Sequence, residues 1–157
     1  MPHNTPFLAK SILVAVDGSE NSRRAVEHVA AVLVCSCEFM VTLLHVIAEP
    51  DPDYFDDSPA RRLEWMGKER REAETYLEEY KRILTGAGLP SSRVTVEVKE
   101  MDCPSIAQCI LAQRESLGAD IIVLGRQGRG AREELLLGSV SKRVVHHAHK
   151  CAIWIVT

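Results

Sequence analysis

The residues with the clearest chemical meaning are four small residues at a fixed spacing: Gly125, Gly128, Gly138 and Ser139. They follow the apolar run 120–124, which has the composition of a buried parallel strand. Glycines after a strand let backbone N–H groups approach an anion, and a helix that begins with small residues adds the positive end of its dipole. The pattern therefore predicts a site for the phosphates of a nucleotide.

The surrounding residues exclude two common phosphate motifs. No lysine separates Gly138 from Ser139, so the segment is not a Walker A loop. From Gly125 to Gly130 the order is G-x-x-G-x-G, whereas the dinucleotide fingerprint is G-x-G-x-x-G. We therefore expect backbone N–H groups and the hydroxyls of Ser139 and Ser141 to supply most phosphate contacts. Three arginines could clamp phosphate or lie solvated: Arg126, Arg129 and Arg132.

Asp17 ends another apolar run, 11–16, and precedes Gly18 and Ser19. In a doubly wound sheet, ligands bind beyond the carboxyl ends of the strands, where the strand order reverses. If the runs 11–16 and 120–125 are neighbouring strands, Asp17 and the glycines flank one crevice. There the carboxylate could accept hydrogen bonds from a ribose or base, or help to hold a divalent cation. Capping of the following helix is the structural alternative.

Strand-like and helix-like segments alternate along the chain, which predicts an α/β fold: a doubly wound parallel sheet with helices on both faces. The proline- and aspartate-rich stretch 48–59 is predicted to be a loop. Pro104 is placed in the first turn of a helix, and Leu63 on the apolar stripe of another. The expected strands are 11–16, 39–47, 93–99 (near an edge), 120–125 and 151–156, and the expected helices are 19–34, 60–86, 104–117 and 138–148.

Length and composition limit the class of protein. With 157 residues, 46% hydrophobic and 26% charged, the chain fits one soluble globular domain, 1–157. Nineteen basic and twenty-two acidic residues leave a net charge of −3, which argues against nucleic acid as a partner. No apolar run approaches the ~20 residues of a membrane span, and the first residues lack the pattern of a secretion signal. We therefore expect no membrane association and a cytoplasmic location.

Cysteines and histidines offer a weaker alternative, a metal or redox site. The five cysteines are Cys35, Cys37, Cys103, Cys109 and Cys151. Their odd number favours reduced thiols, and a C-x-C pair without a second close pair does not make a zinc ribbon. Buried small apolar side chains are the simplest interpretation. A second group, His146, His147, His149 and Cys151, straddles a helix end and a strand start, so its side chains should diverge.

Together these segments resemble the universal stress protein family of the nucleotide-binding kind. The family motif G-x2-G-x9-G-[S/T] is matched by Gly125, Gly128, Gly138 and Ser139 with no change of gap. The stretches 12–19, 43–46 and 118–125 also resemble segments of the family. The resemblance implies a five-stranded, Rossmann-like parallel sheet that binds ATP, or ADP or AMP, and that can hold magnesium or manganese on the phosphates.

By the same resemblance, each part of the site takes one part of the nucleotide. Val46 would offer backbone contacts to adenine. The base and ribose would be lined by Ala15, Val16 and Asp17; the ribose and phosphates would be approached by Leu124, Gly125, Gln127 and Gly128; and the phosphates would be held by Gly138, Ser139, Val140 and Ser141.

The resemblance also implies a homodimer that pairs the last strand, 151–156, across a two-fold axis. In the family this strand usually begins Cys-Pro-Val, whereas here Cys151 is followed by Ala152. Three functions are compatible: a nucleotide-binding stress or signalling module, a slow ATPase, and a structural dimer with an empty pocket. Hydrolysis needs a positioned base and charge neutralisation at the γ-phosphate, and the glycines have neither a Walker lysine nor a catalytic carboxylate beside them. We therefore expect binding with little or no turnover.

Overall fold

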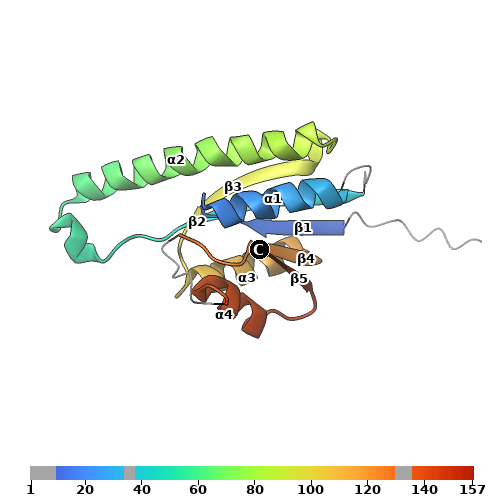
Figure 1. Ribbon diagram of the computed structural model, residues 1–157. Coiled ribbons are helices and arrows are strands. Elements are labelled where there is room, and N and C mark those ends of the chain that lie inside the picture. Colours follow the sequence, from blue (N-terminus) through green and yellow to red (C-terminus); the bar gives the residue numbers. More distant parts are fainter. Residues whose placement is uncertain (1–9, 34–37, 130–135) are drawn as a thin grey trace, which may run out of the picture.

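Five apolar runs form the strands of one parallel sheet in the order β3-β2-β1-β4-β5 (Figure 1). The computed structural model describes residues 10–33, 38–129 and 136–157, so Cys35, Cys37, Gly130 and Arg132 lie outside the described residues. The strands are β1 (Lys10–Ala15), β2 (Phe39–Ile47), β3 (Val94–Glu100), β4 (Ile121–Gly125) and β5 (Ala152–Val156). The predicted five-stranded, doubly wound parallel sheet is confirmed, with β3 at one edge.

Helices cover both faces of the sheet because the central strands β1, β2 and β4 are apolar on both sides. From β1, Ile12 and Val14 pack under one pair of helices, while Leu13 and Ala15 pack under the other pair. The first pair is α1 (Glu20–Leu33) and α2 (Pro59–Gly86); the second is α3 (Ile106–Leu117) and α4 (Ser139–His147). No helix among the described residues is both long and apolar enough to span a bilayer.

The strand order reverses beside β1. From β1 the chain continues outward to β2 and β3, then crosses back to β4 and β5 on the other side. Ala15, the last residue of β1, is in register with Leu44 on one side and with Leu124 on the other. The carboxyl ends of β1 and β4 therefore diverge into a crevice, which is where doubly wound sheets bind ligands.

Two local predictions were wrong. Pro104 does not lie in the first turn of α3: the helix begins at Ile106, and Ser105 caps it by accepting a hydrogen bond from Gln108 N at 3.3 Å. Serine satisfies the free N–H groups of a helix start, so the helix begins after it. The stretch 48–59 is also not entirely loop, since Pro52–Phe55 forms a 3-10 turn that buries Phe55, and Pro59 begins α2.

Leu63 does not lie on a buried stripe. Its side chain is 72% exposed, because the first half of α2 projects beyond the sheet (Figure 1). Only the second half, with Ala73, Leu77, Tyr80 and Leu84, packs into the core. A helical apolar pattern predicts which residues share a face, but the position of the sheet decides how much of that face is covered.

Candidate functional site

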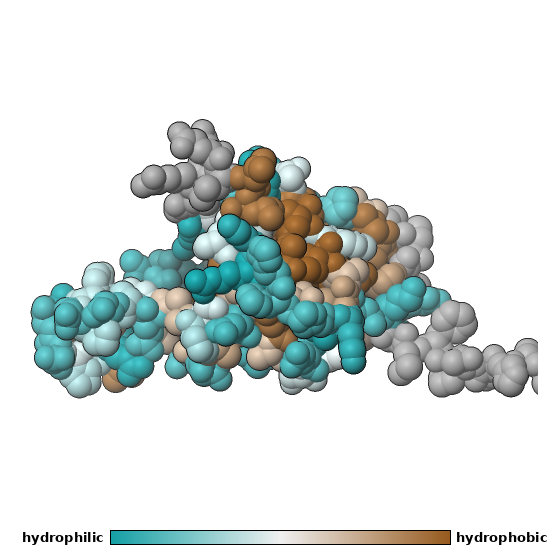
Figure 2. Space-filling model, turned by 90° about the horizontal axis from the view of Figure 1, so that it is seen from below, coloured by the Kyte–Doolittle hydropathy of each residue, from teal (hydrophilic) through white to brown (hydrophobic). Residues whose placement is uncertain are grey.

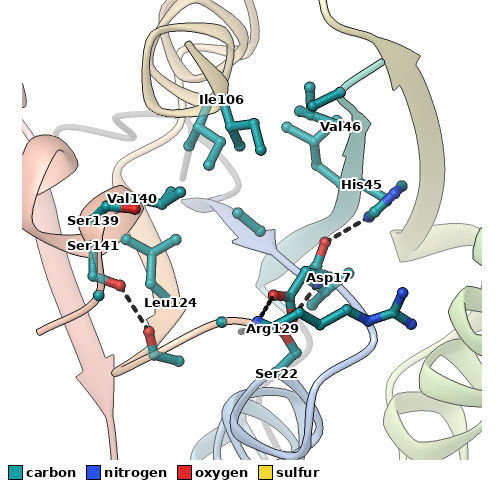
Figure 3. A pocket seen from close by; sticks show the side chains of 18 of the residues that line it. Asp17, Ser22, His45, Val46, Ile106, Leu124, Arg129, Ser139, Val140 and Ser141 are labelled. Atoms are coloured by element: carbon teal, nitrogen blue, oxygen red, sulfur yellow. Dashed lines mark hydrogen bonds between the residues drawn. The ribbon is translucent and has the colours of Figure 1, made fainter. Parts of the chain in front are cut away.

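A cavity of about 600 Å³ lies at the carboxyl ends of β1, β2 and β4 (Figure 3). This volume is in the range of small-molecule sites. The twelve residues assigned to the site from the sequence all line it: Ala15, Val16, Asp17, Val46, Leu124, Gly125, Gln127, Gly128, Gly138, Ser139, Val140 and Ser141. The fold therefore brings together residues that lie more than 100 positions apart in the chain.

One wall of the cavity is the start of α4. Gly138 occupies the N-cap position with extended backbone, and no side chain caps this turn. The N–H of Gly138 itself donates to the Arg126 carbonyl at 2.9 Å, which fixes the turn against the end of β4. The first N–H groups of a helix have no partner within the helix, so an uncapped start is prepared for an anion.

Ser139 and Ser141 differ in their hydroxyl groups. The Ser141 Oγ–H donates to the Gly125 carbonyl at 2.9 Å, and the side chain is buried. This bond ties the first turn of α4 to the last residue of β4. Ser139 is exposed at the cavity. The Ser141 hydroxyl is therefore used within the protein, whereas the Ser139 side chain is exposed at the cavity.

Asp17 joins two loops of the site. Its Oδ1 accepts from Ser19 N at 3.0 Å and from Ser22 Oγ at 2.7 Å, and its Oδ2 accepts from Arg129 N at 2.8 Å. Burial opposes ionisation, but these hydrogen bonds together lower the pKa of the Asp17 carboxyl below its ordinary value. The ionised side chain of Asp17 therefore both caps the turn before α1 and holds the glycine loop through the Arg129 N–H.

The first two glycines of the motif lie against the start of α1. A Cβ on Gly125 would stand 2.7 Å from the Asn21 carbonyl carbon, and a Cβ on Gly128 would collide with Asp17 Oδ2. The Asn21 amide also donates to the Gln127 carbonyl at 3.1 Å. A side chain at either glycine would therefore push the loop away from α1. Both glycines are needed for packing within the protein, whether or not a ligand is bound.

A polar group on β2 and α2 completes this side of the cavity. His45 Nδ1 lies 3.0 Å from the Val16 carbonyl oxygen and 2.6 Å from the Tyr76 hydroxyl. With a proton on Nδ1 the ring donates to the Val16 carbonyl, and with the proton on Nε2 the Tyr76 hydroxyl donates to Nδ1. Burial lowers the pKa of His45, against the opposing effect of the Val16 carbonyl, and burial also raises the pKa of the Tyr76 phenol.

The opposite wall is apolar and includes residues that the sequence did not assign to the site. Ile106 of α3 lies with Val46, Leu124 and Val140 around this part of the cavity (Figure 3), and Ile110 of the same helix also lines it. Apolar residues at helical spacing share one face of a helix, and that spacing does not distinguish a core position from a cavity wall. The remaining lining residues not assigned from sequence are Ser22, Leu44, His45, Ile47, Ala48, Glu69 and Arg129.

The arginines near the glycines differ in position. Arg129 lines the cavity, and its guanidinium lies against Gly18 and the Tyr76 ring, on the same side as Asp17. Arg126 is not among the lining residues. Of the two described arginines for which phosphate clamping and solvation were both open, only Arg129 borders the cavity. Figure 3 shows Asp17 and His45 across the cavity from Ser139 and Ser141.

Comparisons with known proteins agree with this architecture. The model of the universal stress protein family matches residues 9–157. A universal stress protein of Thermus aquaticus is 32% identical over 154 residues, covering 94% of this chain and 98% of the relative. The solved structure of hypothetical protein MJ0577 is 30% identical, with a TM-score of 0.77 over 95% of this chain and 96% of that one.

Two further solved structures share the fold at lower identity. A universal stress protein in complex with cAMP has a TM-score of 0.62 at 21% identity, over 94% of this chain and 96% of that one. The universal stress protein of Archaeoglobus fulgidus in complex with dAMP has a TM-score of 0.63 at 18% identity, over 96% and 99%. With a family model that spans the sheet, its helices and the whole cavity, this chain belongs to the universal stress protein family.

Proposed function

We propose that the protein binds an adenine nucleotide, ATP or else ADP or AMP, in the cavity and acts as a stress-response or signalling module. The observation that carries this proposal is the uncapped start of α4, which faces the cavity at the point where the strand order reverses. The complexes of two relatives with cAMP and dAMP support the same ligand class.

The two chemically different walls give the nucleotide one orientation. Adenine would lie between the apolar side chains of Val46, Ile106 and Leu124, with the Val46 backbone at its edge. The ribose would lie near Ala15, Val16 and Asp17, and the phosphates at Gly138–Ser141, with Leu124, Gly125, Gln127 and Gly128 between them. Backbone N–H groups and the Ser139 hydroxyl would then neutralise the phosphate charge.

Magnesium or manganese would be held mainly by phosphate oxygens and water. Asp17 already accepts three hydrogen bonds, from Ser19, Ser22 and Arg129, and is committed to the protein. The other lining carboxylate among the described residues is Glu69, on α2. A hard cation with few protein ligands is typical of nucleotide-bound magnesium.

Binding with little turnover is the proposed behaviour, with slow hydrolysis as the alternative. Asp17 and His45 lie across the cavity from Ser139 (Figure 3), so neither stands where a water would attack the terminal phosphate. A structural dimer with an empty pocket is the third candidate function. The cytoplasmic location stays a prediction from the sequence.

The test is the nucleotide itself. Mass spectrometry of material released from the purified protein should identify an adenine nucleotide, and incubation with Mg²⁺ should leave ATP intact. Absence of any bound nucleotide at millimolar concentration would contradict the proposal, and steady ADP release would favour the ATPase.

A matched pair of serine variants tests the orientation. Ser139→Ala should weaken ATP binding about tenfold, because one hydrogen bond to a charged group is lost. Ser105→Ala removes a capping serine of α3 that does not line the cavity, so it should leave the affinity unchanged. Equal affinities for Ser139→Ala and the unaltered protein would show that the phosphates lie elsewhere.

We also propose a homodimer through β5. This strand is a sheet edge among the described strands, and Figure 2 shows apolar residues gathered on the face that carries α3, α4 and β5. Ala152 N and Val156 O bond inward, to Asp120 O and Arg126 N. Because backbone groups of alternate residues point to opposite edges, those of Ile153 and Ile155 point outward, available to a second copy.

Proline substitution tests this edge. Ile155→Pro removes an outward N–H without breaking a bond to β4, so it should shift the dimer to monomer in analytical ultracentrifugation. Val98→Pro makes the same change on the outward side of β3, the other edge, and should leave the dimer intact. A monomeric unaltered protein, or a dimer that only Val98→Pro disrupts, would contradict the proposal.

A further inference from the structure

Two cysteines six positions apart in the chain, Cys103 and Cys109, lie close together at the start of α3. Cys103 lies in the connection between β3 and α3, and Cys109 in the first turns of the helix. The Cys103 Sγ–H donates to Asp102 Oδ1 at 3.3 Å, and Cys109 Sγ lies 3.7 Å from the same oxygen. One carboxylate oxygen thus accepts hydrogen bonds from both thiols. The two sulfurs and this oxygen lie within 4.8 Å of one another.

We propose that Asp102, Cys103 and Cys109 form a binding site for a soft divalent cation of the Zn²⁺ type. A tetrahedral zinc ion with ordinary Zn–S and Zn–O bonds separates its ligand atoms by about 3.5 to 3.8 Å. The observed sulfur–oxygen distances of 3.3 and 3.7 Å lie on either side of the about 3.5 Å expected between a sulfur and an oxygen ligand. The two sulfur–oxygen separations therefore need to change by only a few tenths of an ångström, and the two sulfurs, within 4.8 Å of each other, by at most about 1 Å, to form a coordination sphere.

The backbone holds these donors in place. Met101 N donates to the Ile47 carbonyl at 2.8 Å, directly before Asp102. On the other side, Cys109 N donates to the carbonyl of Ser105, the capping residue of α3, at 3.1 Å. The site is therefore built from fixed turns at both ends, which reduces the entropy lost when a metal binds.

Exposure and donor chemistry decide the kind of metal. Cys109 is buried, Cys103 is half-buried and Asp102 is exposed, so solvent reaches the group and can supply the fourth ligand. Two thiolates and a carboxylate favour Zn²⁺, or Co²⁺ as its spectroscopic substitute, over Mg²⁺ or Ca²⁺. On binding, the two thiol protons pass to solvent and two S–metal bonds form, with no change of oxidation state.

The site differs from the histidine group considered in the sequence. Among the residues that the structure describes, the convergent group of metal-type donors contains none of His146, His147 and His149. It is also separate from the nucleotide proposal, since none of its three residues lines the cavity. A bound ion would tie the β3–α3 connection to the helix whose Ile106 and Ile110 form the cavity wall.

Cobalt titration of the full chain tests the site. The starting variant is Cys35→Ser, Cys37→Ser, Cys151→Ser, fully reduced, so that Cys103 and Cys109 are its only thiols. It should bind one equivalent of Co²⁺ with a near-ultraviolet thiolate-to-cobalt charge-transfer band, and Zn²⁺ should displace the cobalt. No such band in the reduced protein would overturn the proposal.

Ligand variants on that starting protein locate the ion. Cys103→Ser and Cys109→Ala should each weaken cobalt binding at least about 100-fold, and Asp102→Asn about tenfold. Zn²⁺ should raise the Tm of the starting protein and not that of Cys103→Ser. Circular dichroism of the metal-free variants checks the fold, and Cys103→Ser, at the half-buried position, decides the result if Cys109→Ala unfolds. Undiminished binding by Cys103→Ser would overturn the assignment.

Discussion

The two halves of the glycine motif, Gly125 with Gly128 and Gly138 with Ser139, have different structural roles. Gly125 and Gly128 meet Asn21 and Asp17 at the start of α1, so their lack of a side chain is required by contacts inside the protein. Gly138 has more room, since a Cβ there would stand 3.3 Å from the nearest atom, Gln127 Cα. It leaves the first turn of α4 uncapped and facing the cavity.

This difference separates stability from binding within a single motif. The first pair of glycines is set by close packing, which tolerates little added volume. The glycine at the start of α4 is instead set by a missing cap, which costs stability and leaves N–H groups for an anion. Substitutions in the two halves should therefore affect the free energy of unfolding and ligand affinity in different ratios.

The largest effect is expected at Gly125. Gly125→Ala should lower the free energy of unfolding by about 3 kcal/mol, because the new methyl group meets the backbone of Asn21, which cannot rotate away. Urea denaturation without nucleotide measures it. Gly86→Ala is the control: nothing lies within 4 Å of that Cβ, so stability should be unchanged or higher. Equal stability of the two variants would contradict the packing role of Gly125.

Asp17 provides the next largest effect. Asp17→Asn should lower the free energy of unfolding by about 2 kcal/mol at neutral pH, since an amide oxygen cannot replace both carboxylate acceptors. The folded-state pKa of Asp17 is lowered, so its contribution is present above the ordinary carboxyl pKa and is lost as pH falls through the lowered value. The difference from the unaltered protein should therefore shrink below about pH 4.

A control aspartate sharpens the measurement on Asp17. Asp120 accepts one hydrogen bond, from Ser11 N at 3.0 Å, at the opposite end of the sheet. Asp120→Asn should cost less than Asp17→Asn at neutral pH. A stability difference for Asp17→Asn that persists unchanged into acid would contradict the ionised bridge between the two loops.

The smallest change in stability, with opposite sign, is expected at Gly138. Gly138→Asp supplies the missing cap and should raise the free energy of unfolding by only about 0.3 kcal/mol, because glycine is itself a tolerated N-cap residue. It should also weaken ATP binding at least tenfold, because the carboxylate occupies the N–H groups and repels phosphate. Gly138→Ala adds the same Cβ without a cap. If it lowers the affinity as much as Gly138→Asp does, steric obstruction is the cause instead of capping; isothermal titration calorimetry decides.

Much of the fold could be predicted because its information is local. Apolar runs and the alternation of segments predicted five strands and four helices. The pairing of β1 with β4 was assumed, as the condition under which Asp17 and the glycines flank one crevice. The same residues placed Gly138 and Ser139 at the start of a helix. These features depend on periodicity and on residues within a few positions of one another, which a single sequence contains.

Only the tertiary structure decided what each of these residues touches. It showed that a side chain at Gly125 or Gly128 would meet Asn21 or Asp17. It also showed that the Ser141 hydroxyl donates to the Gly125 carbonyl, and that Cys103 and Cys109 both contact Asp102. It also left Leu63 exposed, although its helical spacing is that of a core residue. Such contacts join segments brought together by packing of the whole sheet, and local spacing carries no record of that packing.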